Sequence, residues 1–250
     1  MPPNVHNANA AGTGFMTWYT SVPPITRTYA TAVFAATVVT WLGILGPIHI
    51  ALMWQPVVQK LEVWRLFTNF LYIGKFSFSF VIKMIWILTY GAQLESTTFQ
   101  FEPADYLYML LFGGASMMLS SAALHQYFYG NSVIFMLLYV WSRHFPEQKV
   151  SIMGLVTVMS FYLPFAFVGM SIVMGQDPTT DIIGIVVGHL YFFLKVLYPA
   201  TSGRQLLVTP QFLKNWLASR GLGQPAFTHA AGGQPEFRPF RGGGMRLGVD

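Results

Sequence analysis

Long apolar segments alternate with short polar ones along most of the chain. A helix that crosses a bilayer needs about 20 mainly apolar residues. The fourth predicted span, Tyr127–Trp141, is short by this measure. Pro164 predicts a kink in the fifth predicted span, Ile152–Met174. The pattern predicts an all-α membrane protein with six spanning helices: Tyr29–Ile50, Phe76–Leu94, Tyr106–Leu124, Tyr127–Trp141, Ile152–Met174 and Ile182–Leu197.

The segments outside these helices have other patterns. Four residues before Pro23 have helical spacing, which indicates either a short amphipathic helix in the membrane interface or a loosely packed segment. These residues are Phe15, Trp18, Tyr19 and Val22. The first connection, 55–72, is amphipathic and too polar to span. We therefore expect an N-terminal segment over residues 1–28 and a membrane domain over 29–198.

The last 52 residues differ in composition from the membrane domain. Nine glycines and five prolines fall within residues 199–250, a content typical of disordered segments. This indicates a disordered C-terminal tail. One amphipathic turn is expected within the tail, on the membrane surface. It consists of Phe212, Leu213, Trp216 and Leu217.

Composition and charge agree with a membrane class. The chain is 54% hydrophobic and 9% charged, whereas soluble domains carry about 25% charged residues. It has no cysteine, which excludes disulfides and thiolate metal sites, and we predict neither cofactor nor metal. The net charge of +5 is concentrated in the tail, so it indicates topology rather than nucleic-acid binding. With the N-terminus in the cytosol, ten Lys and Arg residues lie on that side and three on the other. Both termini are predicted to be cytosolic.

Two short motifs occur in the membrane domain. In the first loop, Arg65 follows Trp64. Arginine can bind a lipid phosphate or anchor a loop, and Trp favours the headgroup level, so an ordinary interfacial anchor remains equally open. In the sixth segment, Gly184 and Gly188 form G-x-x-x-G. This spacing lets a second helix backbone approach closely, and packing within the chain is the default interpretation.

Together the two motifs resemble the rhomboid superfamily, and most closely its Derlin branch, over roughly residues 15–200. The stretches that carry the resemblance are Trp64-Arg65-Leu66-Phe67-Thr68-Asn69-Phe70, Tyr139-Val140-Trp141-Ser142-Arg143 and Gly184-Ile185-Val186-Val187-Gly188-His189-Leu190-Tyr191-Phe192-Phe193-Leu194. The resemblance implies a rhomboid-like bundle of six helices.

The residues argue against proteolysis. Proteolytic rhomboids pair a Ser in G-x-S with a His three residues before the G-x-x-x-G. Here Ser132 is present, but Asp181 occupies the His position, and a carboxylate is a poor base at neutral pH. His189 lies eight residues further on, about 12 Å along the helix. We therefore expect a pseudoprotease without catalytic residues, with an active intramembrane serine protease as the alternative.

Several polar residues fall near the luminal ends of the predicted spans. They either line a hydrophilic cavity at the place of the lost active site or lie at the water boundary. The residues are His125, Gln126, Asn131, Ser132 and Asp181. Lys83, near the middle of the second span, is expected to face the bundle interior or to extend to the interface.

The C-terminus carries the spacing F-x-G-x-G-x-x-L. Its anchors are Phe240, Gly242, Gly244 and Leu247. The spacing resembles the SHP box, a short peptide that binds the AAA+ segregase of the valosin-containing protein type. Phe240 and Leu247 would fill apolar pockets of that partner, while the glycines let the backbone approach closely.

The two resemblances imply a function in ER-associated degradation. The chain would lie in the endoplasmic reticulum membrane and help to move misfolded client proteins to the cytosol, with an ER ubiquitin ligase complex and membrane lipids as further partners. Association of several copies stays open, and no nucleic acid is expected. Two rival functions stay open as well: a membrane scaffold that only recruits the ATPase, and a secondary transporter. The short fourth span suggests local thinning of the bilayer.

Overall fold

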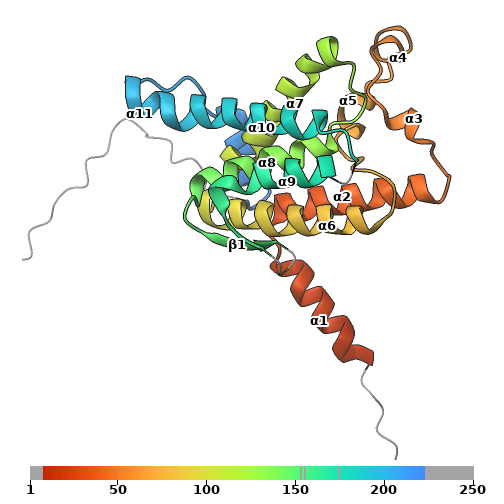
Figure 1. Ribbon diagram of the computed structural model, residues 1–250, viewed down its shortest axis with the longest axis horizontal. Coiled ribbons are helices and arrows are strands. Elements are labelled where there is room, and N and C mark those ends of the chain that lie inside the picture. The colour runs from red at the N-terminus through yellow and green to blue at the C-terminus, as the bar shows by residue number, and fades with distance from the viewer. Residues whose placement is uncertain (1–7, 153, 155, 174, 223–250) are drawn as a thin grey trace, which may run out of the picture.

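The computed structural model describes residues 8–152, 154, 156–173 and 175–222. This part of the chain is mostly helical (Figure 1), and one antiparallel pair of strands interrupts the helices. Turns of 3-10 or π-helical geometry are labelled η. The elements in chain order are α1 (Ala8–Ser21), α2 (Pro24–Trp41), α3 (Pro47–Ile50), α4 (Trp54–Gln59), α5 (Arg65–Thr68), α6 (Phe78–Trp86), η1 (Ile87–Gly91), η2 (Leu94–Thr98), α7 (Pro103–Leu124), α8 (Gly130–His144), β1 (Lys149–Ile152), β2 (Val156–Met159), η3 (Ser160–Tyr162), α9 (Leu163–Val173), α10 (Thr179–Phe192), η4 (Phe193–Leu197), α11 (Tyr198–Ser202) and α12 (Gln211–Ser219).

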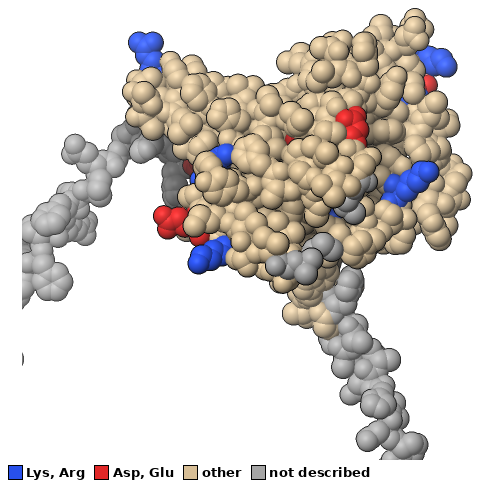
Figure 2. Space-filling model, in the orientation of Figure 1, with Lys and Arg blue, Asp and Glu red and all other residues tan. Residues whose placement is uncertain are grey.

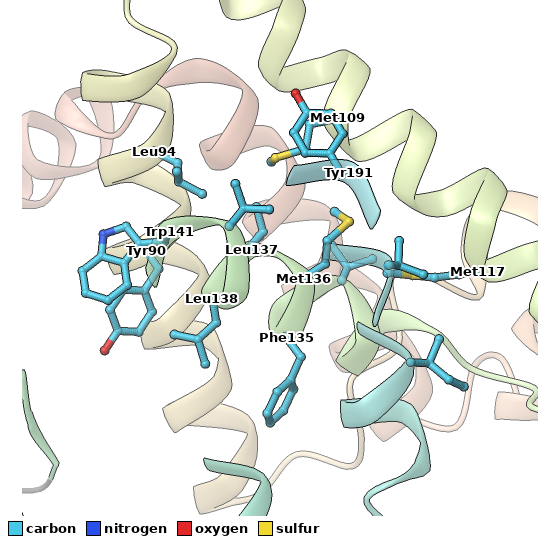
Figure 3. Packing of buried hydrophobic residues seen from close by; sticks show 14 of the residues in the cluster. Tyr90, Leu94, Met109, Met117, Phe135, Met136, Leu137, Leu138, Trp141 and Tyr191 are labelled. Atoms are coloured by element: carbon cyan, nitrogen blue, oxygen red, sulfur yellow. The ribbon is translucent and has the colours of Figure 1, made fainter. Parts of the chain in front are cut away.

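Helix α8 lies at the centre of the bundle, between α10 and α6 in Figure 1. Every residue from Ser132 to Ser142 is buried, as expected for a helix that is apolar on all sides. Figure 3 shows Tyr90 and Leu94 on one side of this helix and Met117 of α7 on the other. The helix has 15 residues, about 22 Å of length, so the predicted short fourth span is present as a short, buried helix.

The predicted second, third and sixth spans are helical. The second begins as α6 and continues through η1 and η2. Among the described residues, two helices are long and apolar enough to cross a membrane: Pro103–Leu124 and Thr179–Ser202. These two correspond to the third and sixth predicted spans. The count of six spans is not confirmed by length and hydropathy.

The predicted first span was too long. Helix α2 ends at Trp41, and the short helix α3 follows after a break. Within the break, Gly43 has a φ of +72°, a left-handed conformation that ends a helix and that glycine adopts at little cost. Pro47 then begins α3, because proline fits a first helical turn but disfavours helix in the residue before it.

The predicted fifth span was wrong in its first half. Strands β1 and β2 form an antiparallel hairpin there, with Lys149 paired to Met159 and Ile152 paired to Val156. Alternating β-branched and polar residues favour strand over helix. The helix that follows, α9, has only 11 residues. Pro164 lies in its first turn, where proline is tolerated, rather than at a kink.

The segment after residue 199 is not disordered as far as residue 222. Helix α12 packs against the start of α7, where Leu213 and Leu217 are buried together with Ala104. Phe212 and Trp216 on the same helix are exposed, so the segment is an amphipathic helix, and its predicted place on the membrane surface stays a prediction. Residues 223–250, which carry the SHP-like box, lie outside the described residues.

A cluster of polar groups connects this segment to the bundle. Lys195 Nζ lies 2.8 Å from Asp105 Oδ2, and the hydroxyl of Thr209 donates a hydrogen bond to Asp105 Oδ1. Asp105 and Thr209 are both buried. At the surface, Lys214 pairs more loosely with Glu102, at 3.8 Å. The buried cluster therefore joins α7, the end of the sixth predicted span and the residues before α12.

Large apolar side chains cover much of the outer surface. Leu119 of α7 and Val173 of α9 are 80% and 88% exposed. Figure 2 shows a face on which charged side chains are few and isolated. A soluble monomer rarely exposes so much apolar surface, so the surface agrees with a membrane protein. Helix α1 covers the predicted interfacial residues except Val22, which follows its last residue, and it projects away from the bundle (Figure 1).

Candidate functional site

The site is built where α10 crosses α8. Gly184 and Gly188 lie on the face of α10 that meets α8, as their spacing predicts. A Cβ atom on Gly184 would collide with the carbonyl oxygen of Ser132 and would lie 2.8 Å from Cβ of Phe135. A Cβ atom on Gly188 would lie 3.1 Å from Cβ of Tyr139. The two glycines therefore set the distance between the helices, and they bring Asp181 alongside the start of α8.

Ser132 and Asp181 lie close together but do not form a catalytic pair. The hydroxyl of Ser132 donates to the carbonyl oxygen of Thr180 at 2.7 Å. The amide of Asn131 donates to Asp181 Oδ1, and it lies 3.2 Å from the hydroxyl of Thr180. Ser132 and Asp181 are 0% and 1% exposed. Because the Ser132 proton points to a backbone carbonyl, Asp181 does not receive it.

No histidine in the described part of the chain shares a hydrogen bond with Ser132. Nδ1 of His189 lies 2.7 Å from the hydroxyl of Tyr139, further along the contact between α8 and α10. His144 bonds to the carbonyl oxygen of Val140. The geometry thus agrees with the inference that His189 cannot take the position of a catalytic base.

A polar cavity of about 330 Å³ opens beside this pair of helices. Lys83 of α6 lines it, and Lys83 Nζ lies 3.4 Å from the carbonyl oxygen of Ile73. The charge of Lys83 is also attracted to the buried carboxylate of Asp181. Of the two positions expected for Lys83, the structure therefore favours the one inside the bundle. The remaining lining residues are Tyr72, Ile73, Gly74, Gln126, Tyr127, Phe128, Asn131, Gln176, Asp177 and Thr180.

Only some of the residues expected at a cavity line this one. Gln126 and Asn131 line it as expected. His125 instead lines a neighbouring cavity of about 620 Å³ beside α4, to which Gln126 also belongs. Ser132 and Asp181 do not belong to the lining. They form the buried support of the cavity rather than its surface.

Asp177 and Thr180 are lining residues that the sequence did not single out. Hydrogen bonds from the backbone and hydroxyl of Thr179 to Asp177 hold the pKa of that carboxyl below its usual value. An acidic residue followed by proline and two threonines is a typical helix start. That signal predicts where α10 begins, but not that the start of the helix borders a cavity.

Arg65 anchors the first loop. Its guanidinium donates to the carbonyl oxygens of Ile48 and Ala51, at 2.5 and 2.9 Å, and pairs with Glu62. Arg65 is buried, whereas Trp64 is half exposed. Of the roles weighed for this arginine, the geometry favours loop anchoring over lipid binding, because Nε and Nη1 donate within the chain and the side chain is buried.

Comparison with known proteins agrees with these features. The sequence model of the Der1-like family matches residues 22–211. Derlin-1 of Arabidopsis thaliana is 42% identical over 219 residues, which cover 86% of this chain and 82% of the relative. Derlin-1 of Oryza sativa subsp. japonica is 41% identical over 239 residues, 92% of this chain and 97% of the relative. A probable derlin-2 homolog of Dictyostelium discoideum is 38% identical over 208 residues, 80% and 82% of the two chains. The chain belongs to the Der1-like family of derlins.

Proposed function

We propose that this derlin is a non-catalytic component of ER-associated degradation. It lies in the endoplasmic reticulum membrane as a six-span, rhomboid-like bundle with both termini in the cytosol. It helps misfolded proteins to cross to the cytosol, in contact with a ubiquitin ligase complex. Its C-terminal SHP-like box recruits the AAA+ segregase that extracts them.

The observation that carries the proposal is a polar cavity next to a buried serine, Ser132, that has no base among the described residues to activate it. A serine becomes a nucleophile when a base accepts its proton. The hydroxyl of Ser132 is directed at the Thr180 carbonyl, and no described histidine reaches it. One oxygen of Asp181, Oδ1, accepts a hydrogen bond from the amide of Asn131. These contacts support a pseudoprotease, in which the former catalytic residues hold α8 against α10.

The cavity offers polar groups where a membrane would otherwise present only hydrocarbon. A client segment that enters a bilayer loses hydrogen bonds to water, at a cost of several kcal/mol for each unsatisfied backbone group. Lys83, Asn131 and Thr180 supply donors and acceptors beside the short helix α8. That helix, at about 22 Å, is shorter than a bilayer core of about 30 Å. Because α8 is buried inside the bundle, local thinning of the bilayer, which would shorten the polar path, would have to arise at the lipid-facing helices around it.

The segregase contact rests on the tail motif, which lies outside the described residues. Phe240 and Leu247 would be its apolar anchors, with Gly242 and Gly244 between them. An extended peptide pays to become ordered, so a single box binds weakly. A hexameric ATPase offsets this weakness by linking several contacts.

The decisive experiment captures the segregase from detergent extracts on the native protein and on the F240A/L247A double variant. Loss of capture by the double variant is the expected result. Phe237→Ala is the matched control, because Phe237 lies in the same tail but outside the motif. Equal capture by native protein and double variant would remove the SHP-like box from the proposal.

The protease alternative has its own test. A fluorophosphonate probe labels a serine that a base activates. We expect the native protein to show no more labelling than Ser132→Ala. Labelling that Ser132→Ala abolishes would replace the proposal with an active intramembrane protease.

The scaffold alternative differs in which residues matter for client export. Export should fall in Lys83→Met and Asn131→Leu, which remove polar groups from the cavity, while segregase capture stays intact. If both variants export clients at the native rate, the membrane domain serves only as an anchor for the tail.

A further inference from the structure

A groove of about 440 Å³ lies on the outside of the bundle, away from the polar cavity. Its volume falls in the range of small-molecule sites, about 300–1,000 Å³. Three elements form it: the end of α1, the first half of α2 and the middle of the α6–η1 helix. Most of its walls are apolar, and these walls consist of Trp18, Val22, Ala30, Phe34, Met84 and Leu88.

The polar groups of the groove gather at one end. Arg27 lies in the first turn of α2, with its guanidinium carbon 5.4 Å from the ring centre of Tyr19. The one hydrogen bond of its guanidinium group among the described residues is a long one, 3.4 Å, to the carbonyl oxygen of Thr20. No acidic side chain in the described ranges pairs with it. The hydroxyl of Thr31 donates to the carbonyl oxygen of Arg27 and lies 2.8 Å from the hydroxyl of Tyr19. Arg27 thus retains donors for an anion.

The length of the groove follows from helix geometry. Arg27 and Phe34 are seven residues apart on α2, which corresponds to about 10 Å along the helix axis. Trp18 and Tyr19 lie beside the charged end, and such aromatic residues favour the headgroup level of a membrane. The groove therefore combines one cation at headgroup level with about 10 Å of apolar wall that extends towards the hydrocarbon.

We propose that this groove binds one phospholipid with an anionic headgroup. The phosphate takes the free donors of Arg27, and one acyl chain lies along Phe34, Met84 and Leu88. Arginine suits a phosphate because its planar fork can donate two parallel hydrogen bonds. A second copy of the chain is the rival occupant, but packing of another apolar helix would leave the charge of Arg27 without a partner. The inference goes beyond the proposed function and does not depend on the segregase.

The test uses the full-length protein, delipidated in detergent and titrated with dioleoylphosphatidylserine or dioleoylphosphatidylcholine. Native mass spectrometry counts the bound lipids, and thermal unfolding reports stabilisation. We expect one phosphatidylserine to bind more tightly than phosphatidylcholine and to raise Tm, because the choline cation cancels the phosphate charge that faces Arg27, whereas phosphatidylserine keeps a net negative charge. Glycerol phosphate, which lacks the chains, should bind far more weakly than either lipid. Equally tight binding of glycerol phosphate would overturn the proposal in favour of a simple anion site.

Variants of Arg27 test what its charge contributes to lipid binding. Arg27→Gln should weaken the binding of phosphatidylserine about tenfold, which is the effect of losing one charge-assisted hydrogen bond. Arg27→Lys should restore part of this affinity. Arg220→Gln is the matched control, because Arg220 lies at 5.3 Å over the ring of Trp216 but outside the groove. Unchanged binding by Arg27→Gln would refute the lipid site.

The groove itself is tested from the α6–η1 helix. Leu88→Trp fills the apolar end and should weaken both lipids, whereas Val81→Trp, on the same helix but not in the lining, should not. Comparable Tm values without lipid show that both variants are folded. If Leu88→Trp changes the oligomeric state and leaves lipid binding intact, a second copy occupies the groove and the proposal fails.

Discussion

At the residue scale, the contact between α8 and α10 depends on the absence of two side chains. Gly184 faces the Ser132 carbonyl with no room for a Cβ atom, whereas Gly188 leaves contacts of 3.1 to 3.2 Å. The cost of a methyl group should therefore differ between the two positions. Backbone atoms cannot move aside as a flexible side chain can, so the helices must separate where Gly184 is replaced.

We predict that Gly184→Ala lowers the stability of the purified protein by about 1–3 kcal/mol, the range for overpacking a core. Gly188→Ala should lower it less. The matched control is Gly169→Ala in α9, where an added Cβ meets nothing within 4 Å, and alanine should be neutral or stabilising there. Thermal unfolding in detergent measures all three. Equal Tm values for the Gly184 and Gly169 variants would contradict the close contact.

The residues of the site were predictable where the signal is local in sequence. Two glycines four positions apart identify a face of close approach whatever the partner helix is. The role of Arg65 was not decided by sequence, because its acceptors, the carbonyls of Ile48 and Ala51, lie 14 to 17 residues away. Thr180 was missed for a similar reason, because its carbonyl oxygen accepts a hydrogen bond from the hydroxyl of Ser132, which lies on another helix.

At the element scale, the hairpin of β1 and β2 replaces half of a predicted span. Hydropathy alone assigned residues 152–174 to one helix, because the strands and α9 are both apolar. The period of two in Val156–Met159 distinguishes strand from helix, but only over four residues. Short apolar runs remain ambiguous by pattern, and the pairing with β1 decides the outcome. The end of α2 was likewise hidden by the apolar residues that follow Gly43.

The position of the hairpin predicts that β2 is accessible to water on the cytosolic side. Because the protein has no cysteine, a single introduced thiol gives an unambiguous signal. Val156→Cys, 59% exposed on β2, should react with a membrane-impermeant maleimide from the cytosolic side. Leu119→Cys, 80% exposed on α7, should resist it, since lipid covers that helix. Protection of Val156→Cys in sealed microsomes, with reaction after detergent is added, would instead place this segment inside the bilayer or on the luminal side, and would contradict the prediction.

At the scale of the whole molecule, the structure places a folded helix between the membrane domain and the tail. A segregase that pulls on residues 240–247 would transmit force through α12, which is held by Leu213, Leu217 and the cluster at Asp105. Hydrophobic contact alone would let the helix slide along α7. The buried ion pair and the Thr209 hydrogen bond fix its position, because separating buried partners leaves a charge without compensation.

The strength of this connection can be measured by substitution. Asp105→Asn removes the charge that faces Lys195, which is 25% exposed in the native protein. Breaking a buried pair costs about 3–5 kcal/mol, and the partial exposure of Lys195 favours the lower end. We expect residues 204–222 to exchange amide hydrogens at least about a hundredfold faster than in the native protein, since about 3 kcal/mol exceeds two factors of ten.

A matched variant tests whether burial is the cause. Lys214→Gln breaks the exposed pair to Glu102, whose atoms are 3.8 Å apart. Exposed pairs contribute about 0–1 kcal/mol, so exchange in residues 204–222 should change little. If the two variants accelerate exchange equally, the buried cluster is not what holds α12. If neither does, burial of Leu213 and Leu217 is sufficient, and a pull on the tail would meet resistance from apolar contact alone.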